Sequence, residues 1–466
     1  MKKKEVVFAG IDISKGYADF HLMNDCKIMV EKGFQLDDNQ QGHQILKEII
    51  CRYTSAGITL IFGIENTGGY EQNWVELLKK MRKTAAVEVY KLNPKAVKHQ
   101  IASHLKRTIN DGVSAEGIAE YVANNYQQYS QNWSNSTDPD PTVASLQQFF
   151  RYINSLIKQQ TAKSNQLEKL LYQNFPEMLS FCKSGKPNWL LRMLCKYPTA
   201  VNVRKASIER LDAIKGITEK KASEIKALAD KSVAKQSLAL DQMIIKELAE
   251  TILFYQHKIN ALKQVLIDSY MSDSVMLLKT IKGIGDWSAA ALVLLLGDIS
   301  RFNDTNQLVA FYGVHPRFKQ SGDGKWGVKM SKQGDKHMRA LLFVAANNVI
   351  IHNPYFSSLY KKYLAAGKKP KVAKGIIMHK LLRVIYGMLK TQTAFDPQVD
   401  EMNQKKFSAS EIQQLPMSTA ARRYQSVALN APISRTNHKK RRAVLEHQES
   451  SRDPNAVSSQ TALEQK

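Results

Sequence analysis

The stretch EVVFAGIDISK at residues 5–15 decides how the first part of this chain folds. Its run of β-branched, aromatic and small apolar residues is too short for a helix and is typical of a strand buried on both faces. Asp12 then lies near the end of that strand, at the edge of a core, and the strand itself offers no lysine or arginine to offset its charge. We expect either a hard metal cation at Asp12 or a turn that this aspartate caps.

The rest of residues 1–130 continues the pattern and predicts an α/β domain. Amphipathic segments at residues 40–53 and 71–81 predict helices. Further strands are predicted from the apolar runs at residues 17–23, 27–31, 59–65 and 87–92. The run at 59–65 also ends in a carboxylate, Glu65, and Asp111 opens a predicted helix. Carboxylates that meet from separate elements suit Mg²⁺, which can stabilise both oxygens of a phosphodiester displacement.

Composition narrows the class of partner. The chain has 466 residues and a formal net charge of +25. Such an excess favours a polyanion, most commonly nucleic acid, with an acidic membrane surface as the rival. The longest apolar run, residues 289–296, is far shorter than the roughly 20 residues that span a membrane, and the lysine-rich start does not fit a signal peptide. We expect a cytoplasmic protein whose four cysteines are core thiols.

Residues 131–272 are predicted to form a linker and a helical, coiled-coil region. Apolar residues recur at spacings of three and four over residues 143–173 and 238–270, which predicts two long helices that pair antiparallel. The apolar stripe serves either packing within one chain or assembly between protomers. An Ile-Lys-Gly-Ile sequence at 214–217 returns at 281–284 as a weak internal repeat.

Residues 273–395 concentrate the positive charge, with 15 Lys and 4 Arg against 5 Asp and no Glu between residues 275 and 390. The second repeat is similar to a helix-hairpin-helix, in which backbone N–H groups can face a phosphate, although glycines also turn helices for steric reasons alone. Farther on, Ser321 lies in a glycine-flanked, lysine-rich loop, where neighbouring cations could support its attack on a phosphate. The predicted nucleic-acid contacts are Lys282, Gly283, Gly285, Arg317, Lys319, Lys325, Lys332 and Arg339. Residues 396–466 are expected to be a basic, mostly disordered tail.

Two sets of residues resemble an insertion-sequence transposase family that includes the pilin-gene inverting recombinases. Asp12, Glu65 and Asp111 match three of the four acidic positions of that family's RNase H-like, RuvC-like domain, and Ser114 stands at the fourth. The pattern of its mostly α-helical C-terminal transposase domain is matched by Gly313, Pro316, Ser321, Gly322, Ser331, Lys332, Gly334 and Arg339.

The resemblance implies a DNA recombinase. Ser321 would be the nucleophile that forms a 5′-phosphoserine link, with Ser331 as the fallback. Asp12, Glu65 and Asp111 would hold Mg²⁺ beside it, and Ser114 would be a weak or water-mediated ligand. The implied partners are double-stranded DNA at the element ends and target, a noncoding bridge RNA, and further copies of the chain in dimers that pair into tetramers at the bacterial nucleoid.

Three other functions remain open from the residues. A junction-resolving endonuclease would use the metals alone and form no covalent adduct. An actin-like sugar kinase or ATPase also begins with a strand similar to GIDISKG, although the later phosphate motifs of that fold are missing. A catalytically weakened nucleic-acid binder is the outcome if Ser114 abolishes metal binding.

Overall fold

The computed structural model describes residues 5–65, 68–103, 111–134, 140–183, 185–234, 238–321 and 324–399, and beyond these only residues 402, 438, 439 and 442. Within these ranges the side chains of 128–134 and 318–328 are not described. The chain forms two compact units, Met1–Asp138 and Pro139–Lys466. The expected tail lies outside the described residues, apart from the few named above.

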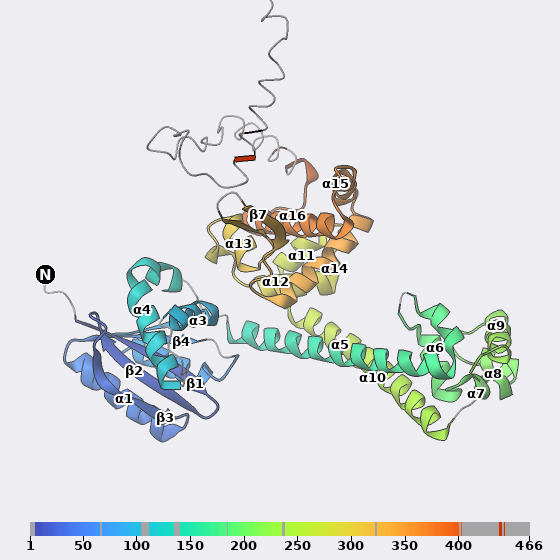
Figure 1. Ribbon diagram of the computed structural model, residues 1–466, viewed down its shortest axis with the longest axis horizontal. Coiled ribbons are helices and arrows are strands. Elements are labelled where there is room, and N and C mark those ends of the chain that lie inside the picture. Colours follow the sequence, from blue (N-terminus) through green and yellow to red (C-terminus); the bar gives the residue numbers. More distant parts are fainter. Residues whose placement is uncertain are drawn as a thin grey trace, which may run out of the picture. The chain divides into compact units, whose positions relative to one another are not determined.

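The first unit is built on a five-stranded mixed sheet (Figure 1). Its strand order is β3-β2-β1-β4-β5, in which β1 runs antiparallel to β2 and parallel to β4, and β5 is parallel to β4. The strands are β1 (Val6–Ser14), β2 (Tyr17–Asn24), β3 (Met29–Asp37), β4 (Thr59–Glu65) and β5 (Val87–Leu92). The predicted α/β domain is confirmed.

Helices cover both faces of this sheet, which explains why β1 and β4 are apolar on both sides. On one face α1 (Gln40–Ser55) and α2 (Gln72–Arg82) pack Leu46, Ile50 and Trp74 against the alternate residues of β1 that include Val7 and Ile11. On the other face, α3 (Pro94–Ser103) and α4 (Asp111–Ser134) pack against the intervening residues, such as Phe8. Asp12 and Glu65 belong to this second face, because strand residues two apart point the same way.

The second unit is mostly helical and is organised by two long helices, α5 (Pro141–Asn174) and α10 (Ala239–Ser269). Phe150 early in α5 shares a hydrophobic cluster with Ile259 late in α10. Leu171 late in α5 shares another with Ile245 early in α10. The helices therefore pack antiparallel within one chain, as the periodicity predicts, and this packing accounts for most of the apolar stripe.

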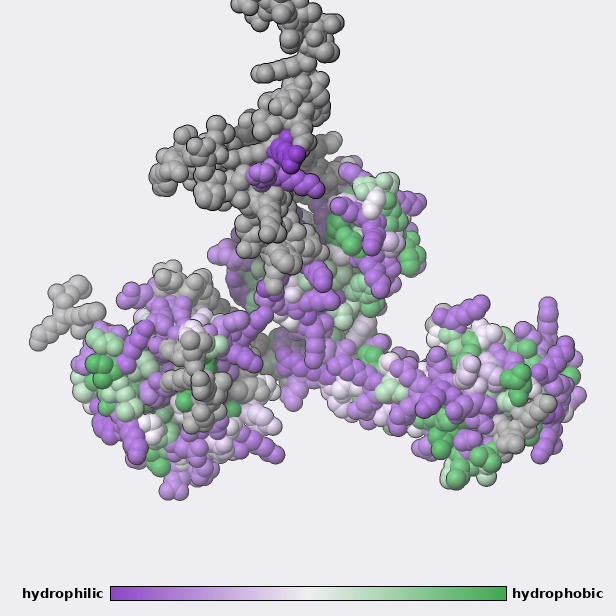
Figure 2. All heavy atoms as spheres, viewed as in Figure 1, coloured by the Kyte–Doolittle hydropathy of each residue, from purple (hydrophilic) through white to green (hydrophobic). Residues whose placement is uncertain are grey.

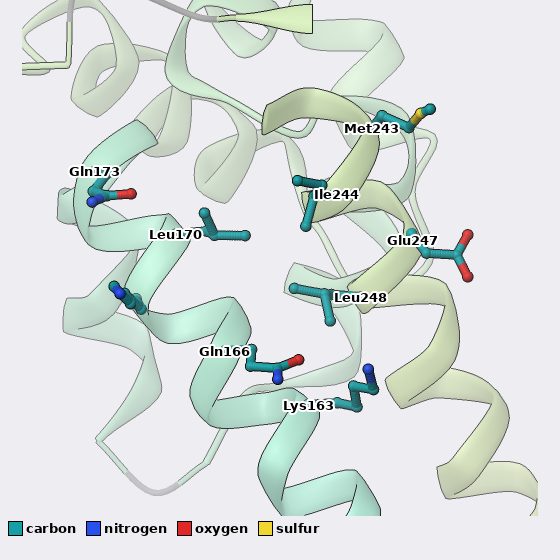
Figure 3. A pocket seen from close by; sticks show the side chains of 9 residues that line it. Lys163, Gln166, Leu170, Gln173, Met243, Ile244, Glu247 and Leu248 are labelled. Carbon is teal, nitrogen blue, oxygen red and sulfur yellow. The ribbon is translucent and has the colours of Figure 1, made fainter. Parts of the chain in front are cut away.

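A groove of about 790 Å³ nevertheless lies between these helices, close to the start of α10 (Figure 3). Leu170 and Leu248 point toward each other across it, and Lys163 and Glu247 are also among the residues that line it. Apolar side chains gather on the surface over this end of α10 (Figure 2). Met243 is 62% exposed there.

Each end of the helical pair carries its own group of short elements. One group surrounds the cluster that contains Leu171, and it consists of the 3₁₀ helix η1 (Pro176–Cys182), α6 (Asn188–Lys196), α7 (Ala200–Lys205), α8 (Ile208–Asp212) and α9 (Glu219–Asp230). The other surrounds the cluster that contains Phe150, and it consists of α11 (Asp273–Lys279), α12 (Asp286–Leu296), η2 (Ile299–Arg301), α13 (Thr305–Phe311), β6 (Pro316–Ser321), β7 (Gly324–Met330), α14 (Lys336–His352), α15 (Pro354–Ala365) and α16 (Pro370–Thr391).

Two expectations are wrong. The glycine-rich stretch before α14 is not irregular, since β6 and β7 form an antiparallel ribbon in which Ser321 pairs with Gly324. Glycine beside a two-residue connection favours a hairpin, so the same residues that disfavour a helix permit this ribbon. Nor are the cysteines all core thiols, because Cys26 and Cys51 are exposed. No helix in the described part of the chain is long and apolar enough to cross a membrane.

Candidate metal centre and nucleic-acid surface

Asp12 and Glu65 lie at the same edge of the sheet because β1 and β4 are parallel neighbours. Ile11 of β1 pairs with Ile64 of β4. Asp12 is the next residue after Ile11, and Glu65 is the next residue after Ile64. Both side chains therefore project from the α4 face at adjacent strand ends. The carboxyl ends of parallel strands are a common position for functional groups, because the chain there leaves the core.

Close packing of α4 on the sheet brings in Asp111 and Ser114. A Cβ at Gly10 would stand 2.0 Å from the Ala115 carbonyl oxygen, so the helix backbone rests directly on β1. Asp111 and Ser114 belong to the first turn of α4, beside this contact. The Ser114 side chain hydrogen-bonds to the Asp12 carboxyl group.

The pKa values of Asp12 and Glu65 are shifted by burial and by their acidic neighbours. Burial raises the pKa of Asp12 from its ordinary value to about 6, and the negative charge of Asp111 adds to the effect. Burial also raises the pKa of Glu65, with a further contribution from Asp12. Ser114 opposes the shift, because its hydroxyl stabilises the ionised form of Asp12 and so lowers the pKa.

Tyr17 and Asp19 belong to this site but are not among the residues predicted from the sequence. The Tyr17 hydroxyl donates a hydrogen bond of 3.2 Å to Asp111 Oδ2. Asp19 faces Asp12 across the β1–β2 pair and adds a further negative charge that acts on it. The sequence did contain a signal for this placement. Lys15 and Gly16 form a two-residue connection between β1 and β2, and such a connection fixes which residues of the two strands lie opposite each other.

The donor set fits a hard divalent cation in its chemistry, since it consists of carboxylate and hydroxyl oxygens. No ion pair joins Asp12, Glu65 or Asp111 to a lysine or arginine in the described ranges, so their charge is not offset there. Among the described residues, no three Asp, Glu, His or Cys side chains are grouped so that they could hold a metal ion.

The Ile-Lys-Gly-Ile repeat corresponds to two hairpins of the same conformation. Gly216 and Gly283 have φ angles of 97° and 103°. The Ile214 N–H donates to the Leu211 carbonyl at 3.1 Å, and the Ile281 N–H donates to the Leu278 carbonyl at 3.1 Å. The helix that follows each hairpin begins without a side-chain cap.

In the second hairpin the predicted phosphate contacts differ in exposure. Lys282 and Gly285 are exposed. Gly283 instead packs against α14, where a Cβ would stand 2.9 Å from the Asn348 carbonyl oxygen. The glycine at 283 is therefore required by packing, which leaves Lys282 and the start of α12 as the surface available to a ligand.

The β6–β7 ribbon holds most of the remaining predicted residues. Lys319 pairs with Trp326 and Lys325 with Gln320, but their side chains and that of Ser321 lie outside the described residues. Arg317 and Lys332 are exposed. Ser331 follows β7, and its N–H donates to the His315 carbonyl at 2.9 Å.

Arg339 is engaged within the protein. Its Nη1 donates to the carbonyl oxygens of Tyr312 at 3.2 Å, Gln333 at 3.4 Å and Gly334 at 2.9 Å. The guanidinium thus holds the segment between β7 and α14 against the end of α13. These contacts with backbone carbonyls explain why an arginine is present at position 339.

Two family models match the chain. One, described as Transposase IS116/IS110/IS902 family, matches residues 275–361, and the other, described as a transposase of the DEDD type, matches residues 9–176. The first covers the second hairpin and the ribbon. The second covers Asp12, Glu65, Asp111 and Ser114. The first hairpin lies between the two matched regions.

Several curated proteins are similar in sequence. The pilin gene-inverting protein of Moraxella lacunata is 33% identical over 132 residues, which are 27% of this chain and 39% of that protein. An uncharacterized 43.6 kDa protein of the insertion element IS110 from Streptomyces coelicolor is 22% identical over 270 residues, 55% of this chain and 65% of the relative. A probable family 20 transposase of Pseudomonas aeruginosa is 24% identical over 158 residues, 33% of this chain and 47% of the relative. The chain therefore spans less than two thirds of each of these relatives.

Proposed function

We propose that this chain, which transposase family models match over residues 9–176 and 275–361, is a DNA recombinase that breaks and rejoins phosphodiesters at the ends of an insertion element and at its target. The observation that supports the proposal is that the charge of Asp111 acts on Asp12 and the charge of Asp12 acts on Glu65, at one edge of the sheet. The strand order, in which β1, β2 and β3 form an antiparallel meander and β4 and β5 run parallel to β1, supports an RNase H-like domain of the RuvC type.

In this proposal Asp12, Glu65 and Asp111 would hold Mg²⁺, and Ser114 would contribute a neutral oxygen directly or through water. A bound divalent cation supplies charge stabilisation for the attacking and leaving oxygens of the phosphate. The chain's own part is to keep three acidic groups together despite their repulsion. Tyr17 supports this by orienting Asp111, and the Ser114 hydroxyl favours the ionised form of Asp12 that a metal requires.

Strand cleavage is assigned to Ser321. Its hydroxyl oxygen attacks the phosphorus and loses its proton, the bond to O3′ breaks, and O3′ leaves as a free 3′-hydroxyl. The 5′-phosphate stays on the serine, so the energy of the phosphodiester is kept for rejoining. The position of residue 321 at the end of β6 supports this role, because a short ribbon suits insertion into a groove of DNA.

Partners follow from the same proposal. The net charge of +25 supports binding of a polyanion such as double-stranded DNA. The family resemblance adds a noncoding bridge RNA that would specify target and donor by base pairing. Recombination needs more than one active site, so we include assembly into homodimers and homotetramers. The exposed apolar residues near the α5–α10 groove, Met243 and Ile244 among them, support such assembly.

The test compares Asp12→Ala and Glu65→Ala with Glu48→Ala, an exposed carboxylate on α1 at the opposite face of the sheet. Recombination of a plasmid that carries the element ends is measured with nucleic-acid binding. We expect the first two variants to lose recombination and keep binding, because removal of a ligand leaves the basic surface unchanged. Wild-type recombination by Asp12→Ala and Glu65→Ala would remove the metal centre from the proposal.

A further inference from the structure

Four basic side chains gather where the β6–β7 ribbon joins the body of the second unit. His315 lies directly before β6, and His379, Lys380 and Arg383 lie on α16. Residues three and four apart are neighbours on a helix, so Arg383 lies beside both His379 and Lys380. His315 is close enough that its charge acts on His379. We call these four residues the ribbon-base cluster.

Packing between the ribbon and α16 holds the cluster in place. Pro316 pairs with Met330 as the first rung of the ribbon. The methyl carbon of Met330 lies 3.3 Å from where a Cβ on Gly375 would stand, one turn of α16 before His379. The Ser331 N–H bonds to the His315 carbonyl at 2.9 Å, which ties both strands of the ribbon to the cluster.

The ribbon-base cluster brings several basic groups close to His379. Burial lowers the pKa of His379, and Arg383, Lys380 and His315 lower it further. Burial, followed by the charge of Arg383, lowers the pKa of Lys380 to about 8. His315 Nδ1 is buried and has no hydrogen-bond partner within the described residues. The charged groups that act on His379 are Arg383, Lys380 and His315, an arrangement that an anion would stabilise.

We propose that the ribbon-base cluster binds a backbone phosphate of duplex nucleic acid and thereby sets how far the ribbon enters it. Arg383 offers paired N–H donors, Lys380 a point charge, and the two imidazoles further N–H donors. Three of the four residues lie beyond residue 361, where the matched family region ends. The inference rests on the proposed function only in taking nucleic acid as the ligand.

The experiment measures binding of the full-length protein to a DNA duplex and to an RNA duplex of the same sequence over a range of salt concentrations. The double variant Lys380→Gln with Arg383→Gln is compared with Lys371→Gln, an exposed lysine at the start of α16. One lost phosphate contact lowers the slope of log affinity against log salt by about 1. We expect that loss in the double variant only, and the duplex that shows it is the ligand.

A second readout uses the wild-type chain and so does not depend on the folding of a variant. The pKa of His379 is followed by NMR with and without duplex, the His379→Gln variant serving to assign the resonance. We expect the pKa to rise on binding, because a nearby phosphate stabilises the protonated ring. An unchanged pKa of His379, together with equal salt slopes for the double variant and Lys371→Gln, would overturn this inference but leave the proposed function standing. A wild-type protein that binds neither duplex would overturn the proposed function as well.

Discussion

The backbones of Gly10 and Ala115 lie so close that a Cβ on the glycine would stand 2.0 Å from the carbonyl oxygen of the alanine. This contact seats α4 on β1. Ala115 directly follows Ser114, so the same contact fixes the first turn of α4 beside the end of β1. The geometry of the acidic site therefore depends on a glycine at residue 10, because any side chain there would push α4 away from β1.

Gly10→Ala is expected to destabilise the first unit by about 3 kcal/mol, because the added methyl meets rigid backbone and forces α4 away from the sheet. Gly387→Ala is the matched control. It lies within α16, nothing stands within 4 Å of the place that its added methyl would take, and we expect a gain of about 0.5–1 kcal/mol there. Thermal or denaturant unfolding measures both. Equal stability of the two variants would contradict the seating of α4 on β1.

Asp12→Asn is expected to stabilise the metal-free protein at pH 8 and to leave its stability nearly unchanged at pH 3. Folding raises the pKa of Asp12 to about 6, above its ordinary value of 3.8. Below that ordinary value the group is protonated in both states and costs nothing, whereas above pH 6 the folded state carries an unfavourable charge. After allowance for partial exposure the gain is on the order of 1–2 kcal/mol.

Melting temperatures with EDTA at the two pH values measure this effect. A stabilisation of equal size at both pH values would mean that charge is not its cause. Added Mg²⁺ at pH 8 should then raise the melting temperature of the wild type more than that of Asp12→Asn, because only the wild type keeps the ligand.

Ser114→Asp tests whether the serine weakens the metal centre. The added carboxylate should lower the Mg²⁺ concentration needed for half-maximal recombination and lower the melting temperature in EDTA, since it brings another negative charge to Asp12 and Asp111. Ser114→Asn, which adds similar bulk without charge, should do neither. A raised Mg²⁺ requirement in Ser114→Asp would show that the serine is an adapted part of the site.

Gly283→Ala is expected to cost more stability than Gly216→Ala. Both positions have positive φ, which costs an alanine on the order of 1 kcal/mol. Only at Gly283 would the new methyl also meet rigid backbone, at Asn348, whereas at Gly216 it would lie 3.1 Å from the side-chain Cβ of Trp189. Unfolding by denaturant compares the two. A larger loss at Gly216 would contradict the packing of the second hairpin on α14.

Much of the fold could be predicted because its signals are local. The strand that ends at Glu65 follows from its apolar run, and the two long helices follow from apolar periodicity. Asp12 and Glu65 could be paired because each ends a strand that the sequence predicts to be buried. The ribbon could not be predicted, since glycines that break a helix are also the residues that a hairpin permits. Ser321 was therefore expected in a loop.

The limits of the site prediction have a different cause. Tyr17 and Asp19 join the acidic site through the register of β1 and β2, and a search for carboxylates at strand ends does not consider register. The ribbon-base cluster depends on a helix packing against a ribbon more than 40 residues away in the sequence. Periodicity gives no information on such a contact. Arg339 is an example of the opposite case. It was predicted to contact nucleic acid from its motif, but in the structure its guanidinium donates to backbone carbonyls.

The most direct test of the account is a search for a covalent adduct between the protein and 5′-phosphate DNA on a denaturing gel. The account predicts an adduct with the wild type and with Ser331→Ala, none with Ser321→Ala, and at most a trace with Ser321→Cys, whose thiol can also attack. An adduct that survives Ser321→Ala and disappears in Ser331→Ala would move the nucleophile to Ser331. Cleavage by both alanine variants without any adduct would contradict the covalent mechanism and leave a hydrolytic nuclease.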